Sequence, residues 1–89
     1  MQVSHIGHYD HGVTGTMTIV TVESSVIAAF YWCDGNNLIP ASLGVTFNSG
    51  KTYRYSGVPA TVFLALLASE SVGNVFNKIV RDKYEFSIL

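Results

Sequence analysis

Alternating apolar and polar positions in the middle of the chain predict a β-hairpin. Residues 43–47, LGVTF, alternate in this way, and an Asn-Ser-Gly turn leads from them into residues 51–56, KTYRYS. Because successive side chains of a strand point to opposite faces, Tyr53 and Tyr55 share one face and Arg54 lies on the other. Cross-strand pairing then places the two tyrosine rings beside the apolar side chains of residues 43–47, or diagonal to them.

Strands are also predicted upstream of the hairpin. Residues 16–22, TMTIVTV, are rich in β-branched side chains, and residues 26–32, VIAAFYW, are apolar at both alternating positions. A strand that is apolar on both faces belongs at the centre of a sheet or beneath another subunit. Residues 1–15 are polar and rich in Gly and His, which favours a loop or a short edge strand. Residues 33–40, CDGNNLIP, carry turn residues and predict an exposed loop.

Two consecutive helices are predicted after the hairpin. Pro59 fits the first turn of a helix over 59–68, and the segment Ser69-Glu70-Ser71 offers an N-cap for a second helix from about 71 to 81. The apolar positions at helical spacing are Val58, Val62, Phe63, Leu66 and Leu67, then Val72, Val75, Phe76, Ile79 and Val80. Residues 83–89 alternate again and predict a last strand. The expected fold is α+β: one domain over 1–89, with a small antiparallel sheet of about four to five strands packed against two short helices.

The composition favours self-association. Of 89 residues, 48% are hydrophobic and 12% are charged, whereas soluble domains usually have a charged share of roughly 25%. A chain of this length buries only a limited share of its surface on folding. We therefore expect a homo-oligomer, because monomers seldom expose large apolar patches.

The sequence predicts neither a membrane span nor a secretory signal. It has no run of about 18 apolar residues, and its first residues lack the basic and apolar regions of a signal peptide. The single cysteine, Cys33, agrees with a reducing compartment. We expect a cytoplasmic protein without a membrane partner.

Positive charge is confined to the second half of the chain. The net charge is -1, and the basic residues are Lys51, Arg54, Lys78, Arg81 and Lys83. Proteins that hold a nucleic-acid backbone usually carry a denser basic stripe. These five side chains suit a small phosphate-bearing ligand better than a polymer.

Catalytic and metal-binding patterns are sparse. His5, His8, His11 and Asp10 have residue types that bind zinc, but a Gly-rich terminal segment does not preorganise them. Cys33 could in principle act as a nucleophile, yet no G-x-S-x-G, G-x-x-x-x-G-K-[ST] or G-x-G-x-x-G motif is present. Cys33 or Ser24 could form a nucleophilic triad with a histidine and Asp34, but nothing in the sequence fixes the geometry of such a triad. We expect no metal, no cofactor and no catalytic residue.

The tyrosine pair is the better candidate for a site, and two interpretations stay open. In one, Tyr53 and Tyr55 pack beneath the helices as core. In the other, one of these rings, or Trp32, stacks on a base or another flat group. The polar members of that site would be Arg54, Lys78 and Arg81 for an anionic part and Asn77 for amide recognition. The competing interpretation of those polar residues is a solvated helix surface.

Three segments carry a resemblance to a known family. They are Ser24-Ser25-Val26-Ile27-Ala28, VTFNSGKTYRYSGVP and LLASESVGNVFNKIVRDKY. Together they resemble the KTSC domain over residues 24–84, most specifically in the Tyr-X-Tyr pair, the Gly57-Val58-Pro59 turn and Phe76-Asn77. The chain departs from the family in a leader, residues 1–23, and in the inserted CDGNNLIPAS.

The resemblance implies two functional hypotheses. The KTSC domain occurs at the C-terminus of some lysyl-tRNA synthetases and in stand-alone bacterial and phage proteins, and RNA binding has been suggested for it. Our first hypothesis is a non-catalytic, oligomeric phage or mobile-element protein that sequesters a nucleotide-derived signalling molecule in the bacterial host cell, as an anti-defence protein. The alternative is an RNA-binding accessory module, which should bind RNA with strong salt dependence.

Overall fold

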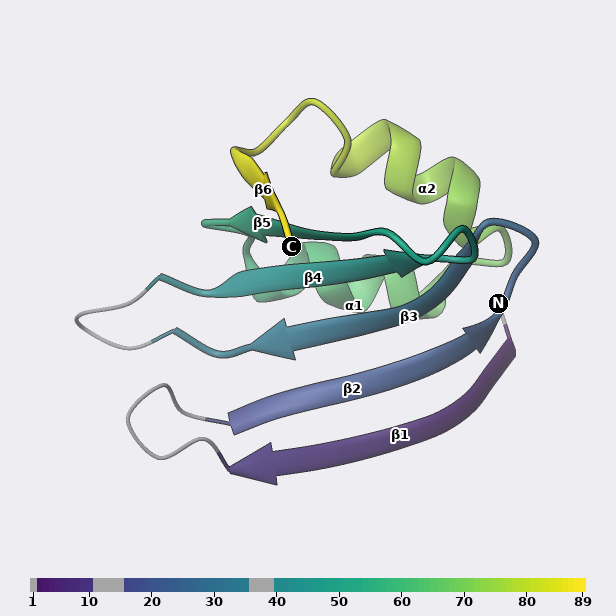
Figure 1. Cartoon of the computed structure of the whole chain (residues 1–89), viewed down its shortest axis with the longest axis horizontal. Helices are drawn as coiled ribbons and strands as arrows, with labels where there is room; N and C mark the ends of the chain where they lie inside the picture. The colour runs from purple at the N-terminus through teal and green to yellow at the C-terminus, as the bar shows by residue number, and fades with distance from the viewer. Residues whose placement is uncertain (1, 11–15, 36–39) are drawn as a thin grey trace.

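The computed structural model describes residues 2–10, 16–35 and 40–89, and these form a six-stranded antiparallel sheet and two helices (Figure 1). The strands lie side by side in chain order, and both helices are inserted between the last two. Their bounds are β1 Gln2–Asp10, β2 Thr16–Glu23, β3 Ile27–Cys33, β4 Ser42–Phe47, β5 Thr52–Ser56, α1 Ala60–Ala68, α2 Val72–Ile79 and β6 Phe86–Ile88. The α+β class is confirmed, with one strand more than the upper expectation.

The additional strand comes from the leader. Residues 1–15 were expected to form a loop or a short edge strand, but β1 is a nine-residue edge strand. It pairs with β2 from Gln2 opposite Glu23 to Asp10 opposite Thr16. Pairing with β2 therefore stabilises a strand in this segment, although its own Gly and His residues do not distinguish a strand from a loop.

The hairpin has the expected pairing. Tyr55 lies opposite Leu43 and Tyr53 opposite Val45, and the turn is completed by Gly50, whose φ of 96° is accessible to glycine. On the other side of β5, β6 pairs Phe86 with Tyr55. The two tyrosines thus lie between two strands in the sheet.

Both helices pack on the same face of the sheet. The Phe63 ring of α1 stacks on Trp32 of β3 at 5.1 Å, and the Phe76 ring of α2 meets Phe47 of β4 edge-on at 5.6 Å. Helix α1 follows the turn at Gly57, which has a φ of 73°, and Pro59 takes the N-cap position. Residues from α1, α2 and β2 to β5 together form the hydrophobic core.

One predicted cap is replaced by another contact. Ser71 precedes α2, but its side chain donates or accepts no capping hydrogen bond. The Ser69 hydroxyl instead donates to the carbonyl oxygen of Leu66 at 2.7 Å. The serine-rich segment therefore stabilises the end of α1 rather than the start of α2.

Candidate functional site

A cavity of about 690 Å³ opens on the helix-covered face, between the β4–β5 turn, β6 and the C-terminal part of α2. Its lining residues are Ser25, Val26, Phe47, Asn48, Ser49, Lys51, Tyr53, Tyr55, Phe76, Asn77, Arg81, Asp82 and Phe86. The segments that line it are far apart in the sequence, since the β2–β3 turn and β6 both contribute. The cavity size falls within the roughly 300–1,000 Å³ typical of small-molecule sites.

Aromatic rings form one wall of this cavity. The Tyr53 ring stacks on Tyr55, at a centroid distance of 6.4 Å, and on Phe86, at 5.4 Å, and Phe86 also contacts Tyr55 at 5.7 Å, so the three rings form a triangular cluster. Phe76 meets Tyr55 edge-on at 5.7 Å, and Phe47 meets Tyr53 in the same way at 5.6 Å. These contacts hold the rings in fixed orientations, so their free surfaces form a preorganised stacking wall.

The two tyrosines differ in burial, so the core interpretation holds for Tyr55, whereas stacking on a ligand stays a prediction for Tyr53. Tyr55 is only 4% exposed and belongs to the core. Tyr53 is half-buried and packs on the edge of that core. A ligand in the cavity would therefore touch mainly Tyr53 and the exposed Phe86, while Tyr55 supports them from behind.

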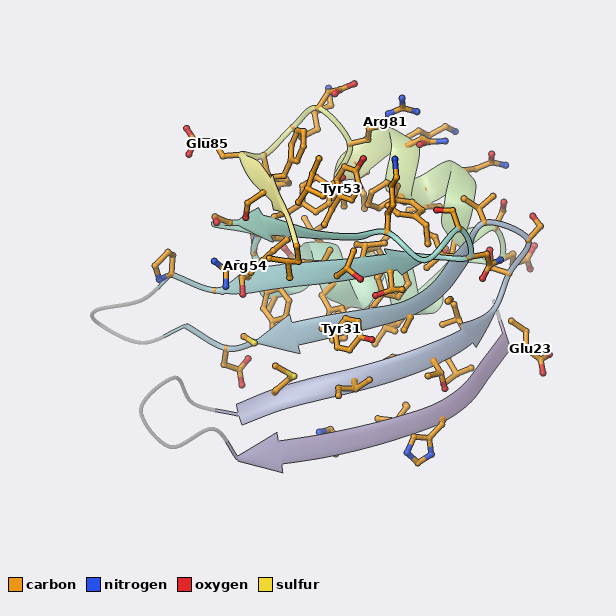
Figure 2. All side chains as sticks on the ribbon, viewed as in Figure 1. Glu23, Tyr31, Tyr53, Arg54, Arg81 and Glu85 are labelled. Carbon is orange, nitrogen blue, oxygen red and sulfur yellow. The ribbon has the colours of Figure 1, made fainter. Side chains whose placement is uncertain are left out.

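Charged groups approach the cavity from two sides. Lys51 comes from the β4–β5 turn, and Arg81 comes from the segment after α2, at the same end of the molecule as Tyr53 (Figure 2). Asp82 follows with a φ of 63°, a left-handed conformation that Asp tolerates at the end of a helix. Two cations and one carboxylate leave the lining with a positive balance, which suits an anionic ligand.

Burial raises the pKa of the Tyr55 phenol above its usual 10.0. Tyr53 and the Asp82 carboxylate raise it further, whereas the Arg81 guanidinium opposes the shift. The Tyr55 hydroxyl is consequently protonated at neutral pH and keeps its ability to donate a hydrogen bond.

Not all predicted site residues meet in the cavity. The structure brings together Tyr53, Tyr55, Asn77 and Arg81. Three others lie elsewhere: Trp32, Arg54 and Lys78. The Trp32 ring is 5% exposed, stacks on Phe63, and donates from Nε1 to Asp34 at 2.6 Å, so it is a core residue.

Arg54 and Lys78 are separated from the cavity for geometric reasons. Arg54 is exposed on the opposite face of β5 and lines a different, shallow hollow with Met17, Tyr31 and Leu89. Lys78 is exposed on α2, outside the lining of the cavity. Neither side chain therefore faces the same space as the tyrosine rings.

Phe47, Phe76 and Phe86 line the cavity but were not predicted as site residues, and Lys51 was considered for a phosphate-bearing ligand without being placed beside the tyrosines. Phe47, Phe76 and Phe86 each carried an apolar pattern that was assigned to packing alone. Lys51 stands two residues before Tyr53, so strand alternation already placed it on the tyrosine side. Phe86 could not be placed, because its pairing with Tyr55 spans both helices in the sequence.

The histidine and serine side chains considered for metal binding or catalysis do not form a site in the described residues. Among the described residues there is no group of three or more His, Cys, Asp or Glu that could hold a metal ion. His5 and His8 belong to opposite faces of β1, and His11 lies outside the described residues. The Ser24 hydroxyl accepts hydrogen bonds from the backbone N–H groups of Val26 and Ile27, at 3.2 and 3.3 Å. Ser24 therefore serves the β2–β3 turn.

Neither α1 nor α2, the helices formed by the described ranges, has the length and apolar character needed to cross a membrane.

Comparison with known proteins identifies relatives of the chain. The sequence model of the KTSC domain matches residues 23–84. A protein of Tsukamurella paurometabola is 40% identical over 63 residues, which cover 71% of this chain and 88% of that protein. An uncharacterized protein of Stutzerimonas stutzeri is 43% identical over 42 residues, which cover 47% of this chain and 59% of that protein. The matched range contains the cavity lining except Phe86, whereas β1 precedes it.

Proposed function

The chain belongs to the KTSC domain family, and on that premise we propose that it is a non-catalytic protein that captures a small nucleotide-like molecule in the aromatic cavity. The observation that carries the proposal is the cluster of the Tyr53, Tyr55 and Phe86 rings beside the cations Lys51 and Arg81. A flat ring and an adjacent anionic group are the ligand features that such a lining recognises.

The energetics suit a ligand of this kind. Stacking of a base on an aromatic side chain contributes about 1–3 kcal/mol, and a hydrogen bond to a charged group contributes about 1.5–3 kcal/mol. Arg81 offers several N–H donors in a planar fork that matches phosphate oxygens, whereas Lys51 supplies a mobile point charge. Asn77 lines the same space and can read a polar edge of the ring.

The distribution of basic residues favours a small ligand over an RNA strand. Lys51 and Arg81 approach the cavity, but Arg54 lies on the other face of the sheet. A polymer that followed the phosphate contacts of all three would have to pass around the sheet edge. The RNA-binding accessory module is therefore the alternative outcome of the experiment below.

We extend the proposal to sequestration. A protein that binds its ligand and leaves it unchanged acts by lowering the free concentration of that ligand. A nucleotide-derived signalling molecule fits the chemistry of the lining. The phage or mobile-element setting and the anti-defence role stay predictions, because the names of the two relatives do not bear on them.

The experiment begins with the protein purified from cells. Native mass spectrometry of the intact protein, followed by denaturation, reports whether a small molecule is carried and what its mass is. Calorimetry with ADP and with cyclic di-AMP as probes then compares the wild type with Arg81→Ala and with the matched control Lys78→Ala. We expect Arg81→Ala to weaken binding about tenfold or more, and Lys78→Ala to leave it unchanged.

Two results would overturn the proposal. One is equal binding by Arg81→Ala and the wild type, since the cavity would then not hold the anionic part. The other is salt-sensitive binding of an RNA of about 20 nucleotides that an Arg54/Lys78/Arg81 triple alanine variant loses. That second result would establish the RNA-binding alternative.

A further inference from the structure

The sheet face opposite the helices has a regular composition that can be read from the strand register. One row of paired residues crosses every strand of the described sheet: Gly7, Ile19, Tyr31, Gly44, Arg54 and Ser87. The next row runs through His5, Thr21, Ala29, Thr46 and Thr52. Both rows point away from α1 and α2, which in Figure 1 lie behind and above the sheet.

This face has little charge for a surface in contact with water. Antiparallel sheets with one solvated face usually alternate between apolar residues on the core side and polar, often charged residues on the other. In the two rows, however, the basic side chains are His5 and Arg54, toward opposite edges of the sheet, and neither row contains an acidic side chain. Small or apolar residues fill the positions between them.

The threonine hydroxyls of these two rows already have partners within the chain. The hydroxyls of Thr46 and Thr52 hydrogen-bond to each other at 2.7 Å. The Thr21 hydroxyl donates to the backbone carbonyl of His5 at 3.4 Å. Covering these three hydroxyls would therefore leave none of them unsatisfied, which lowers the cost of burying this part of the surface.

Gly44 and Ala29 leave room for Tyr31 at the centre of this face. A Cβ atom placed on Gly44 would lie 3.1 Å from the Cβ of Tyr31, so the Tyr31 side chain lies close against the neighbouring strand. Tyr31 is drawn over β3 in Figure 2, on the near side of the sheet. Ala29, with 5% exposure, adds no protruding side chain, and Tyr31, Gly44 and Arg54 line a hollow of about 390 Å³. Two sheet faces pack against each other at a spacing of about 10 Å, with their side chains between them.

We propose that this face binds the same face of a second copy of the chain. The sheet measures roughly 20–25 Å along and across its strands, so each copy would bury roughly 500 Å² and the pair roughly 1,000 Å². That total is at the threshold of about 1,000 Å² for a biological interface, so we expect a weak dimer. A two-fold pair needs a surface that complements itself, and a weakly charged face with few acidic or basic side chains avoids repulsion between the copies.

The pairing is compatible with the proposed function but does not depend on it. The aromatic cavity opens on the helix-covered face, so contact between the opposite faces leaves both cavities accessible. Loss of dimerisation and loss of ligand binding can be measured separately.

The test uses the mass of the full chain in solution. Sedimentation equilibrium from micromolar to near-millimolar concentration should give twice the monomer mass of 9.7 kDa for the wild type. Ile19→Glu places a carboxylate in the central row, and we expect it to raise the dissociation constant about 100-fold or more. The control is Leu64→Glu, at a 59% exposed position on α1, which should remain dimeric.

A second measurement covers the case in which Ile19→Glu does not fold. Cys33 belongs to the same sheet face, since it pairs with Met17 and Ser42 in the adjoining row. Its alkylation by iodoacetamide in the wild type should slow as protein concentration rises into the dimeric range. A monomer at every concentration, a constant alkylation rate, or a dimer broken only by Leu64→Glu would each overturn the proposal.

Discussion

Two adjacent rows of the sheet differ in side-chain size and burial, although their residues alternate along the same strands. The row on the helix side contains Ile6, Val20, Phe30, Val45, Tyr53 and Ile88, and the row on the other side contains Gly7, Ile19, Tyr31, Gly44, Arg54 and Ser87. In the first, Val20, Phe30 and Val45 are fully buried. In the second, Gly44 permits the close approach of Tyr31, and Arg54 is exposed.

The difference shows how one strand can serve two surfaces. On the helix side, bulky side chains fill the space beneath α1 and α2, and where the helices end they leave an aromatic cavity. On the other side, glycines alternate with larger side chains such as Tyr31 and Arg54, and neither α1 nor α2 covers them. Consecutive residues of β5 therefore belong to different surfaces. Tyr53 lines the proposed ligand site, and Arg54 lies on the face of the proposed contact between copies.

The largest loss of stability is expected at Tyr55, the buried member of the aromatic cluster. Tyr55→Ala removes a ring that is 4% exposed and contacts Phe76 and Phe86. We expect a loss of about 3–5 kcal/mol in the free energy of unfolding, because aromatic truncation leaves a cavity in the core. Urea denaturation followed by circular dichroism measures this loss. A variant as stable as the wild type would show that Tyr55 is not part of the core.

The next effect tests the turn that directs the helices to one face. Gly57 has a φ of 73°, and no atom outside its neighbours lies within 4 Å of a Cβ placed there. Gly57→Val should therefore destabilise the fold by about 1–3 kcal/mol through its backbone conformation alone. Gly57→Asn is the matched control, since Asn tolerates the left-handed region. Equal losses in thermal melting of the two variants would contradict this explanation.

A smaller effect should appear only at alkaline pH. The pKa of Tyr55 is raised above 10.0 by burial, then by Tyr53 and Asp82. The folded protein thus retains a proton that the unfolded chain releases near pH 10, so the stabilising contribution is complete below that pH and declines above it. Melting temperatures of the wild type should fall more steeply above pH 10 than those of Tyr55→Phe. Parallel curves would indicate that Tyr55 does not carry the dependence.

Strand alternation predicted the parts of this picture that depend on local order. It placed Tyr53 and Tyr55 on one face, Arg54 on the other, and the pair beside Leu43 and Val45. Arg54 nevertheless stands among the predicted site residues, although strand alternation already separates it from the tyrosine rings. The helix periodicity likewise predicted α1 and α2 to within two residues at each end.

Features that depend on distant partners were not predictable in this way. The β1 strand requires β2, because its own residues favour neither strand nor loop. The position of Phe86 in the cavity requires β6 to return beside β5 after both helices. Trp32 looked like a stacking surface in the sequence, but only the packing of α1 shows that Phe63 already occupies its face.

The smallest effect, Arg54→Ala, separates the two faces most directly. Arg54 is exposed and lies across the sheet from the cavity, so its removal should change the free energy of unfolding by less than about 0.5 kcal/mol and leave ligand affinity unaltered. Lys51→Ala removes a cation from the same hairpin on the cavity side, and it should weaken binding of an anionic probe about tenfold. Calorimetry with ADP on both variants measures the contrast. Weaker binding by Arg54→Ala, with Lys51→Ala unaffected, would show that the ligand binds on the opposite face of the sheet. The proposed contact between copies on that face would then be wrong.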